Sequence, residues 1–303
     1  MNKDYLDQLN MTVGSEKILR NESMKNHTSF KTGGNCDLMV LAANEEDVKT
    51  VLRLSRQFNE PLYVFGNCSN LIVRDKGIRG TVLKIAKGFD EVTVSDNLIT
   101  AQSGALLSKV AKVAQQFGLT GLEFASGIPG TVGGGVSMNA GAYGGEIKDS
   151  LIYSKYIDQD GMVHELDNQG HQFSYRRSFF SDKKDIILSS CFLLQKGDRD
   201  EIQMKMNDFN NQRKMKQPLG FPSAGSVFKR PLGYYTGQLI EQSNLKGFNI
   251  NGAVISSLHA GFIINEKDAS SQDIIDLIAH IQETVYNKYK VTLETEVKIV
   301  GEE

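Results

Sequence analysis

A glycine-rich segment, residues 126–145, carries the strongest sign of ligand chemistry in this chain. It contains eight glycines, out of 29 in the 303-residue sequence, and small or turn-forming residues fill most intervals. Glycine lacks a Cβ atom and tolerates positive φ, so backbone amides in such a segment can approach a bulky anion closely. The segment predicts either a phosphate or pyrophosphate cradle or a glycine-rich turn that only packs tightly.

Two common phosphate-binding motifs do not fit this segment. A Walker loop needs GxxxxGK[ST], and a dinucleotide fingerprint needs GxGxxG between a strand and a helix. Neither pattern is present, and with Pro129 and Asn139 the segment is too long for one tight strand-to-helix turn. If a nucleotide binds here, we expect it to bind without a Rossmann crossover.

The charge balance gives no reason to expect nucleic acid or an anionic membrane as the main partner. The chain has 34 basic and 36 acidic residues, a formal net charge of −2, and 40% hydrophobic residues. This composition is typical of a folded, soluble protein with one large or two to three small domains. We infer no obligate protein partner.

Cysteines, histidines and the amino-terminal residues give expectations about metals and location. Cys36, Cys68 and Cys191 are far apart, and the five histidines form no HExxH or paired pattern, so we expect neither a metal site nor a disulfide framework. The start, MNKDYLDQLN, lacks the apolar run of a signal peptide. No apolar run approaches the roughly 18 residues of a membrane span. We therefore expect a cytoplasmic protein.

Apolar runs in the first hundred residues predict a small βαβ-like unit. Strands are expected at residues 38–41, 62–65, 71–73 and 81–85. Asn44 can cap a helix between the first two, because Asp47 follows three residues later. The buried stripe of that helix is Val48, Val51 and Leu52.

Strand patterns on both sides of the glycine-rich segment predict an α+β subdomain that ends near Lys196. The expected strands are residues 92–94, 98–101, 152–157, 162–166 and 186–194. A helix before the segment should end at Gly118. Its expected apolar face is Leu106, Val110, Val113 and Phe117.

The last hundred residues predict two helices and a final strand. One helix runs from Glu201 to about Lys216, with Ile202, Met206 and Phe209 on one stripe. The other begins at Ser270 and Asp273, which have capping-box spacing. Its apolar stripe is Ile274, Leu277, Ile278, Ile281 and Val285. The ending VTLETEVKIV is typical of a strand.

Seven motifs, taken in order, show a resemblance to one family. They are HTSFKTGG, GNCSNLIV, the glycine-rich segment, SYRRS, PSAGSVFKRP, HAGFIIN and LETEVKIVG. Over nearly its full length the chain resembles UDP-N-acetylenolpyruvoylglucosamine reductase, the NADPH-dependent flavoenzyme that makes UDP-N-acetylmuramate for the bacterial cell wall. The resemblance implies an α+β FAD-binding fold of the vanillyl-alcohol-oxidase (PCMH) type in two subdomains, residues 1–198. A substrate-binding α+β domain, residues 199–303, would follow, with its last strand returning toward the flavin.

The resemblance also implies three catalytic residues for hydride transfer to an enolpyruvyl ether. Arg176 of SYRRS matches the catalytic arginine, and its planar guanidinium suits the substrate carboxylate, where negative charge develops. Ser226 of SAGSVF matches the proton donor to the substrate carbon. Glu296 of LETEV matches the catalytic glutamate, which holds the carboxylate through a shared proton or orients the proton relay. Arg177 and Glu294 are expected to be ordinary solvated neighbours.

The same resemblance implies FAD contacts from two stretches of the chain. They are Gly66, Asn67, Cys68, Ser69, Asn70 and Leu71, and then Gly127, Gly130, Thr131, Gly133, Gly134, Ser137, Asn139, Ala140 and Gly141. Thr32, Gly33 and Gly34 either form a turn near the same ligand or only shape the first strand.

Four positions depart from the usual family pattern. Cys68 and Gly135 stand where glycine and alanine are common, and Gln238 and Leu258 stand where lysine is frequent. Fewer lysines could weaken the binding of an anionic substrate diphosphate or of NADPH. Two other functions therefore stay open beside the reductase: a same-fold FAD oxidase of another alcohol or sugar, and a noncatalytic nucleotide-binding paralogue.

Overall fold

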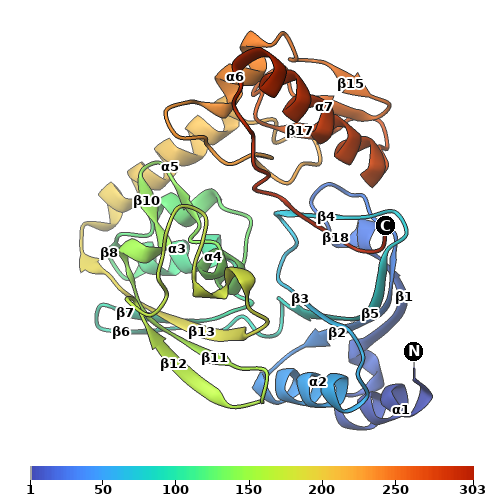
Figure 1. The fold of residues 1–303 in the computed structure, drawn as a ribbon. Coiled ribbons are helices and arrows are strands. Elements are labelled where there is room, and N and C mark those ends of the chain that lie inside the picture. The colour runs from blue at the N-terminus through green and yellow to red at the C-terminus, as the bar shows by residue number, and fades with distance from the viewer. Residues whose placement is uncertain (1) are drawn as a thin grey trace. The chain divides into compact units, whose positions relative to one another are not determined.

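The computed structural model describes residues 2–303, and the chain forms two compact units (Figure 1). The first unit comprises the chain up to residue 20 together with residues 38–67 and 80–213. The second comprises residues 21–37, 68–79 and 214–303. Both units contain helices and strands, which confirms the expected α+β class.

Strands occur mostly in runs, with helices between the runs. The α-helices are α1 (Lys3–Thr12), α2 (Glu45–Gln57), α3 (Leu107–Gln116), α4 (Val132–Ser137), α5 (Arg199–Lys216), α6 (Thr236–Gln242) and α7 (Ser271–Tyr289). The 3₁₀ helices are η1 (Ser15–Lys17), η2 (Met24–Asn26), η3 (Glu123–Gly127), η4 (Ile147–Asp149) and η5 (Phe179–Asp182). The strands are β1 (Ile18–Ser23), β2 (Asn35–Ala42), β3 (Leu62–Phe65), β4 (Leu71–Val73), β5 (Ile78–Ile85), β6 (Val92–Ser95), β7 (Leu98–Gln102), β8 (Leu119–Thr120), β9 (Gly141–Ala142), β10 (Gly145–Glu146), β11 (Leu151–Ile157), β12 (Val163–Asp167), β13 (Ile186–Leu193), β14 (Gln195–Lys196), β15 (Asn249–Ile250), β16 (Ala253–Ile255), β17 (Ile263–Asn265) and β18 (Lys298–Val300).

One sheet with the order β1-β2-β5-β3 contains most of the predicted βαβ-like unit. Strand β3 runs parallel to β5, and helix α2 connects β2 to β3. The cap of α2 is confirmed, because the Asn44 side chain accepts a hydrogen bond from the Asp47 amide at 2.8 Å. Its predicted stripe of Val48, Val51 and Leu52 is also buried, and α1 packs beside α2 (Figure 1).

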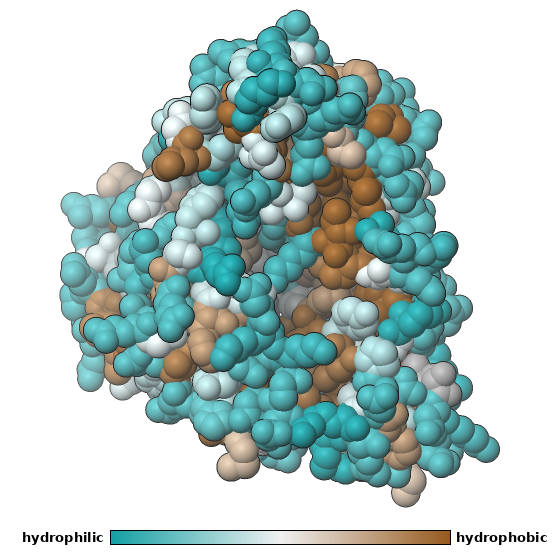
Figure 2. All heavy atoms as spheres, viewed as in Figure 1, coloured by the Kyte–Doolittle hydropathy of each residue, from teal (hydrophilic) through white to brown (hydrophobic). Residues whose placement is uncertain are grey.

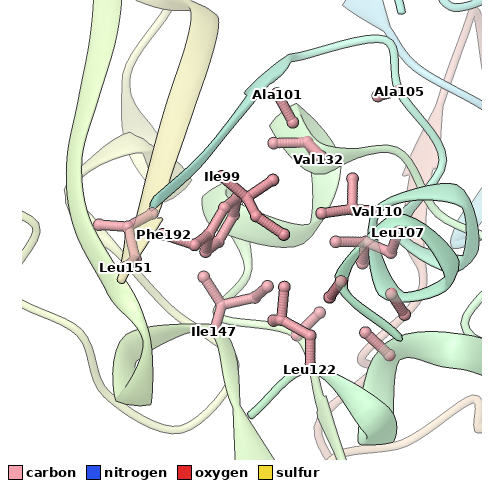
Figure 3. Packing of buried hydrophobic residues seen from close by; sticks show 14 of the residues in the cluster. Ile99, Ala101, Ala105, Leu107, Val110, Leu122, Val132, Ile147, Leu151 and Phe192 are labelled. Carbon is pink, nitrogen blue, oxygen red and sulfur yellow. The ribbon is translucent and has the colours of Figure 1, made fainter. Parts of the chain in front are cut away.

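A five-stranded antiparallel sheet with the order β12-β11-β13-β7-β6 forms the other part of the first unit. Helices α3 and α4 pack on it, and Figure 3 shows Ile99 and Phe192 of the sheet in one core with Leu107 and Val110 of α3. This core carries the glycine-rich segment, because Val132 belongs to the same cluster.

The predicted apolar face of α3 is confirmed at Val110 and wrong at Leu106 and Phe117. The helix buries Leu107, Val110, Ala111 and Ala114. Leu106 and Phe117 lie at its two caps and are 39% and 53% exposed. The large residues suggested one face, but the buried face is rotated from it, because the small side chains of Ala111 and Ala114 allow close packing. The predicted end is confirmed, since Gly118 has φ +64° and its amide donates to the Gln115 carbonyl.

The second unit holds the sheet β15-β16-β17, helices α6 and α7, and a parallel pair of β4 with β18. The strand predicted at residues 71–73 therefore exists but does not belong to the βαβ-like unit. The strand predicted for VTLETEVKIV is mostly wrong, because only Lys298–Val300 is a strand. Before it, Leu293 and Val297 turn into the core of this unit. Between them Thr295 forms only an isolated bridge with Phe228, so this part of the segment does not pair with a continuous neighbouring strand.

Several elements carry no strong sequence pattern and were not predicted. Helix α1 and strand β1 form in the first 23 residues, for which no helix or strand was predicted. The glycine-rich segment contains α4. Thr131 starts α4, because its side chain accepts a hydrogen bond from the Gly134 amide at 3.4 Å. Tertiary packing stabilises this short helix against the low helix propensity of its three glycines.

The surface is largely polar where Figure 2 shows it, with smaller groups of hydrophobic residues between hydrophilic ones. No helix within residues 2–303 is long and apolar enough to cross a membrane. The three cysteines are buried free thiols.

The capping box of α7 allows a direct test of the second unit. Ser270 Oγ accepts from the Asp273 amide at 3.0 Å, and Asp273 Oδ2 accepts from the Ser270 amide at 2.8 Å. We predict that Ser270→Ala lowers the free energy of unfolding by about 1 kcal/mol, measured by urea denaturation. Ser270→Asp keeps an acceptor and should stay close to the parent protein. An equal loss in both variants would contradict the capping role.

Candidate active site

The SYRRS motif forms a tight turn that presents Arg176. Ser174 and Arg177 exchange two backbone hydrogen bonds of 3.0 and 3.2 Å, so Tyr175 and Arg176 lie at the tip of the turn. Arg176 has φ +55°, a conformation that non-glycine residues rarely adopt. Its side chain is half-buried, and Nη2 donates to the Gly141 carbonyl at 3.0 Å. The guanidinium thus contacts the glycine-rich segment within the first unit.

A fully buried amide, Asn139, holds the Arg176 turn in place. Its Nδ2 donates to the Ser174 carbonyl at 3.1 Å and to Glu146 Oε2 at 3.2 Å, and its Oδ1 accepts from the Lys148 amide at 3.1 Å. These bonds engage both amide hydrogens and the amide oxygen. The side chain of Asn139, which is 0% exposed, is therefore committed to protein contacts.

Two further groups anchor the same loop. Ser178 Oγ donates to the Ser137 carbonyl at 2.8 Å, at the end of α4. His171 is buried, with Nδ1 2.6 Å from the Asp167 carbonyl and Nε2 3.0 Å from Ser154 Oγ. Burial lowers the pKa of His171, so the imidazole is neutral at physiological pH. The loop that presents Arg176 is thus fixed on both sides of the turn.

The predicted FAD contacts of the first unit pack together around α4. A Cβ atom at Gly66 would lie 2.2 Å from Thr131 Oγ1, and one at Gly133 would lie 2.9 Å from Ser103 Cβ. Asn67 Nδ2 donates to the Pro129 carbonyl at 2.7 Å. The loop at residues 66–67 and the glycine-rich segment are therefore in contact through backbone and small side chains, as a cradle for a bulky ligand requires.

Ser103 gives this region a polar atom that suits a ligand. Its Oγ is buried and has no hydrogen-bond partner among the described residues. Buried hydroxyls are nearly always hydrogen-bonded, so such an atom marks a place where a bound polar group or water completes the site. It lies beside Gly133, whose amide donates to the Ser103 carbonyl at 2.9 Å.

The remaining predicted FAD contacts, Cys68 to Leu71, belong to the second unit. Cys68 has φ +50°, which explains why glycine suits this position. Asn70 Nδ2 donates to the Glu296 carbonyl at 3.1 Å, and the Asn70 carbonyl accepts from the Lys298 amide at 3.1 Å. The Asn70 side chain therefore fixes the backbone at one of the predicted catalytic residues.

Ser226 and Glu296 lie on neighbouring segments of the second unit. The Glu296 amide donates to the Val227 carbonyl at 2.8 Å. Ser226 also forms an antiparallel bridge with Phe262, while Phe228 forms one with Thr295. The segment from Ser226 to Phe228 is thus held between the HAGF and TEV motifs. The structure brings these two predicted catalytic residues together, although they are 70 positions apart in the sequence.

Glu294 and Arg177, which were expected to be solvated neighbours of the catalytic residues, are exposed. The Glu294 side chain is 72% exposed and pairs with Lys229 at 3.2 Å. The Arg177 side chain is also exposed and pairs with Asp182. Residues 294–296 lie in the part of VTLETEVKIV that is not a strand. Glu296 is half-buried, so the two carboxylates have different environments.

His259 is a residue of this site that sequence reasoning missed. A Cβ atom at Gly261 would lie 3.0 Å from the His259 ring and 3.5 Å from Ser226 Oγ, so the ring and the hydroxyl flank the same glycine. His259 Nδ1 accepts from the Gly261 amide at 3.1 Å, which leaves the proton of the neutral ring on Nε2. Burial lowers the pKa of His259. His259 is the first residue of the HAGFIIN motif, and this motif is the sequence signal that could have identified it.

The other predicted positions serve the packing of the backbone. Cβ atoms at Gly33 and Gly34 would lie 2.9 Å from Val73 Cβ and 2.1 Å from the Asp75 carbonyl oxygen. These contacts favour the alternative in which the turn shapes the chain. A Cβ atom at Gly135 would lie 2.8 Å from Leu107 Cδ1, so glycine there makes room for a core side chain.

Gln238 and Leu258, the two positions where lysine is frequent in the family, are exposed. The exposed fraction of Leu258 is 52%. Leu258 lines a cavity of about 460 Å³ in the second unit, and the side chain of Lys214 lines it as well. A cation therefore borders the position where the resemblance places a lysine. The effect of the two departures on ligand binding stays a prediction.

No group of three or more metal-ligating side chains occurs within residues 2–303.

Comparison with known proteins identifies the family. Residues 217–300 match the family described as UDP-N-acetylenolpyruvoylglucosamine reductase, C-terminal domain, and residues 36–167 match the family described as FAD binding domain. The reductase of this name from Clostridioides difficile is 47% identical, covering 99% of this chain and 98% of that protein. The one from Pediococcus pentosaceus is 46% identical, covering 95% of each. The chain belongs to the UDP-N-acetylenolpyruvoylglucosamine reductase family.

Solved structures of this reductase family and of its fold agree with that assignment. The crystal structure of the reductase from Thermus caldophilus matches with a TM-score of 0.79 at 31% identity, covering 93% of this chain and 97% of that one. An alkyldihydroxyacetonephosphate synthase matches with a TM-score of 0.51 at 16% identity, covering 65% of this chain and 41% of that one, which shows the fold alone. The predicted PCMH-type FAD-binding fold with a carboxyl-terminal reductase domain is confirmed.

The structure is compatible with FAD in the matched region. Residues 36–167 include α4, the close approach of Gly66 to Thr131 and the buried Ser103 hydroxyl. Small residues, backbone amides and a polar atom that lacks a protein partner suit the phosphates and polar edges of a dinucleotide. FAD is therefore the cofactor of this reductase-family chain.

The role of Asn139 can be tested by exchanging its amide nitrogen for an oxygen. Asn139→Asp removes both N–H donors and places a carboxylate beside the Ser174 carbonyl and Glu146, so the Arg176 turn should shift. We predict that kcat/KM falls roughly 10- to 100-fold in a steady-state assay. Asn287→Asp on the exposed side of α7 is the control and should leave kcat/KM unchanged. Full activity of Asn139→Asp would show that the turn holds without this amide.

Proposed function

We propose that this chain is the FAD-dependent, NADPH-oxidising reductase that converts UDP-N-acetylglucosamine enolpyruvate to UDP-N-acetylmuramate in peptidoglycan precursor synthesis. The observation that carries the proposal is the family match over nearly the whole chain, with the catalytic motifs in place. Arg176 on a fixed turn, and Ser226 beside the segment of Glu296, support it. The substrate is a small UDP-sugar, and we place the reaction in the cytoplasm.

The proposed division of labour follows the two families that match. Residues 1–198 bind FAD, and residues 199–303 bind the UDP-sugar, with the carboxyl-terminal β18 returning to pair with β4 beside Asn70. The predicted cofactor contacts act chiefly through backbone amides, because the Asn139 side chain is committed to protein contacts. Bound FAD supplies the hydride chemistry, which links NADPH oxidation to reduction of the enolpyruvyl double bond.

The three catalytic residues act on the substrate end of the reaction. Arg176 binds the enolpyruvyl carboxylate and stabilises the charge that develops next to it, because its planar guanidinium can donate two hydrogen bonds to a carboxylate. Ser226 Oγ donates a proton to the substrate carbon. Glu296 orients the carboxylate or the returning proton from the adjacent segment. A positive φ at Arg176 and a bridge at Ser226 keep both groups at fixed backbone positions.

A stopped-flow experiment separates this function from its two alternatives. Purified protein is mixed first with NADPH and then with UDP-N-acetylglucosamine enolpyruvate, and flavin absorbance is followed. Bleaching by NADPH and recovery with the enolpyruvate support the reductase. Recovery only with oxygen supports an oxidase of the same fold. A preparation that carries no flavin, and takes up none when FAD is added, supports the noncatalytic paralogue.

Removing the proposed proton donor should affect one half-reaction only. We predict that Ser226→Ala leaves flavin reduction by NADPH nearly unchanged and slows reoxidation by substrate about 10²- to 10⁴-fold. Rapid-mixing absorbance measurements give both rates. Equal losses in the two half-reactions would contradict the role of Ser226.

Glu294 offers a matched control for Glu296. We predict that Glu296→Gln slows reoxidation by substrate about 10²-fold while flavin reduction is kept, because the carboxylate acts on the substrate. Glu294→Gln removes an exposed carboxylate two residues away and should leave both rates unchanged. If the two variants behaved alike, the assignment of Glu296 would be wrong.

A further inference from the structure

Helix α5 has an apolar stripe that packs on the core of the first unit. Polar residues follow this stripe toward the carboxyl-terminal end of the helix. Ile202 and Met206 are buried, and Phe209 packs against the same core of the first unit. Arg213 follows four residues after Phe209, so it lies on the same side of the helix, with Asn210 next to it. The polar end of this stripe meets the beginning of the glycine-rich segment.

Two side chains of α5 hold residues 126–127 directly. Asn210 Nδ2 donates to Ser126 Oγ at 3.3 Å, and Arg213 Nη1 donates to the Gly127 carbonyl. A Cβ atom at Gly127 would lie 2.6 Å from Asn210 Oδ1 and 3.1 Å from Arg213 Nε. A larger residue at position 127 would displace these two side chains of α5, so glycine there leaves room for their contacts.

Two more contacts join α5 to the far end of the segment and to the residues just before it. The ring of Phe209 stacks on that of Tyr143, with centroids 4.6 Å apart and planes 5° apart. Lys205 pairs with the buried Glu123 carboxylate at 3.6 Å, just before the segment begins. One helix therefore contacts both ends of a segment whose many glycines would otherwise leave it flexible.

Arg213 also carries an atom that points to a role beyond packing. Its Nε is buried and has no hydrogen-bond partner among residues 2–303, although it adjoins Gly127. A buried N–H of a charged group is costly to leave without an acceptor. The segment it touches lies within the region that matches the FAD-binding family.

We propose that Asn210 and Arg213 are positioning residues for FAD, which fix the backbone of residues 126–130 before the cofactor binds. Ordering a glycine-rich segment costs conformational entropy, and anchoring it in the apoprotein removes that cost from the binding step. The proposal rests on the proposed function, since it requires FAD in this region. It assigns to α5 a function that lies outside the matched FAD-binding residues, 36–167.

The experiment compares two asparagines on the same helix. The Asn207 side chain accepts a hydrogen bond from Gln203 at 2.9 Å on the exposed side of α5, whereas Asn210 donates to Ser126. FAD is titrated into flavin-free protein, and the quenching of flavin fluorescence gives Kd. We expect Asn210→Ala to raise the Kd about tenfold and Asn207→Ala to change it less than twofold.

Arg213 provides the second variant and a conservative rescue. We expect Arg213→Ala to raise the Kd for FAD at least as much as Asn210→Ala, and Arg213→Lys to restore part of the affinity, because an ammonium can still donate to the Gly127 carbonyl. The urea midpoint of each apoprotein is measured in parallel. For Asn210→Ala it should match that of Asn207→Ala, since a positioning role affects binding more than folding.

The outcomes separate this inference from the proposed function. Parent protein that binds no FAD would contradict the proposed function itself. Parent protein that binds FAD, with an unchanged Kd in Asn210→Ala and Arg213→Ala, would overturn only the role of α5. A weaker Kd together with a proportionate fall in the urea midpoint would also overturn it, because the helix would then act through stability alone.

Discussion

The candidate site depends on one buried amide, that of Asn139. A buried side-chain amide must form its hydrogen bonds inside the protein, and Asn139 does so with Ser174, Glu146 and Lys148. These bonds connect the end of α4 to the turn that presents Arg176. The glycine-rich segment and the predicted catalytic arginine are therefore parts of one hydrogen-bonded structure. Neither can move without breaking a buried hydrogen bond, which is costly in a low-dielectric interior.

Three residues of the candidate site are among the non-glycine residues that have positive φ. Asn139, Arg176 and Cys68 have φ of +45°, +55° and +50°, where a non-glycine residue costs roughly 1–2 kcal/mol. Asn139 and Arg176 are held by side-chain hydrogen bonds, and Cys68 is one of the predicted cofactor contacts at residues 66–71. Strain of this kind persists where surrounding contacts determine the conformation, and it is common at functional sites. Holding these three residues in this conformation therefore lowers the free energy of unfolding.

Sequence patterns predicted those features of the fold that depend on residues close together in the chain. The caps of α2 and α7 and the end of α3 at Gly118 depend on residues a few positions apart, and all three are correct. The pairing of β4 with β18 joins residues more than 220 positions apart, and no sequence pattern encodes such a partner. The motifs located Ser226 and Glu296 through family resemblance, whereas His259 and α5 act through contacts visible only in three dimensions.

The glycine-rich segment shows why composition left two explanations open. Most of its glycines are explained by packing: Gly127 faces α5, Gly133 faces Ser103, and a Cβ atom at Gly145 would lie 2.6 Å from the Phe124 ring. Gly144 has φ +85°, so its backbone conformation requires glycine. At Gly134, in contrast, the nearest described atom to a Cβ would be Thr131 Oγ1 at 3.5 Å, an ordinary contact. Tight packing and a ligand cradle are therefore not alternatives. Packing fixes the path of the backbone, and a position that packing leaves open is where a cofactor can approach it.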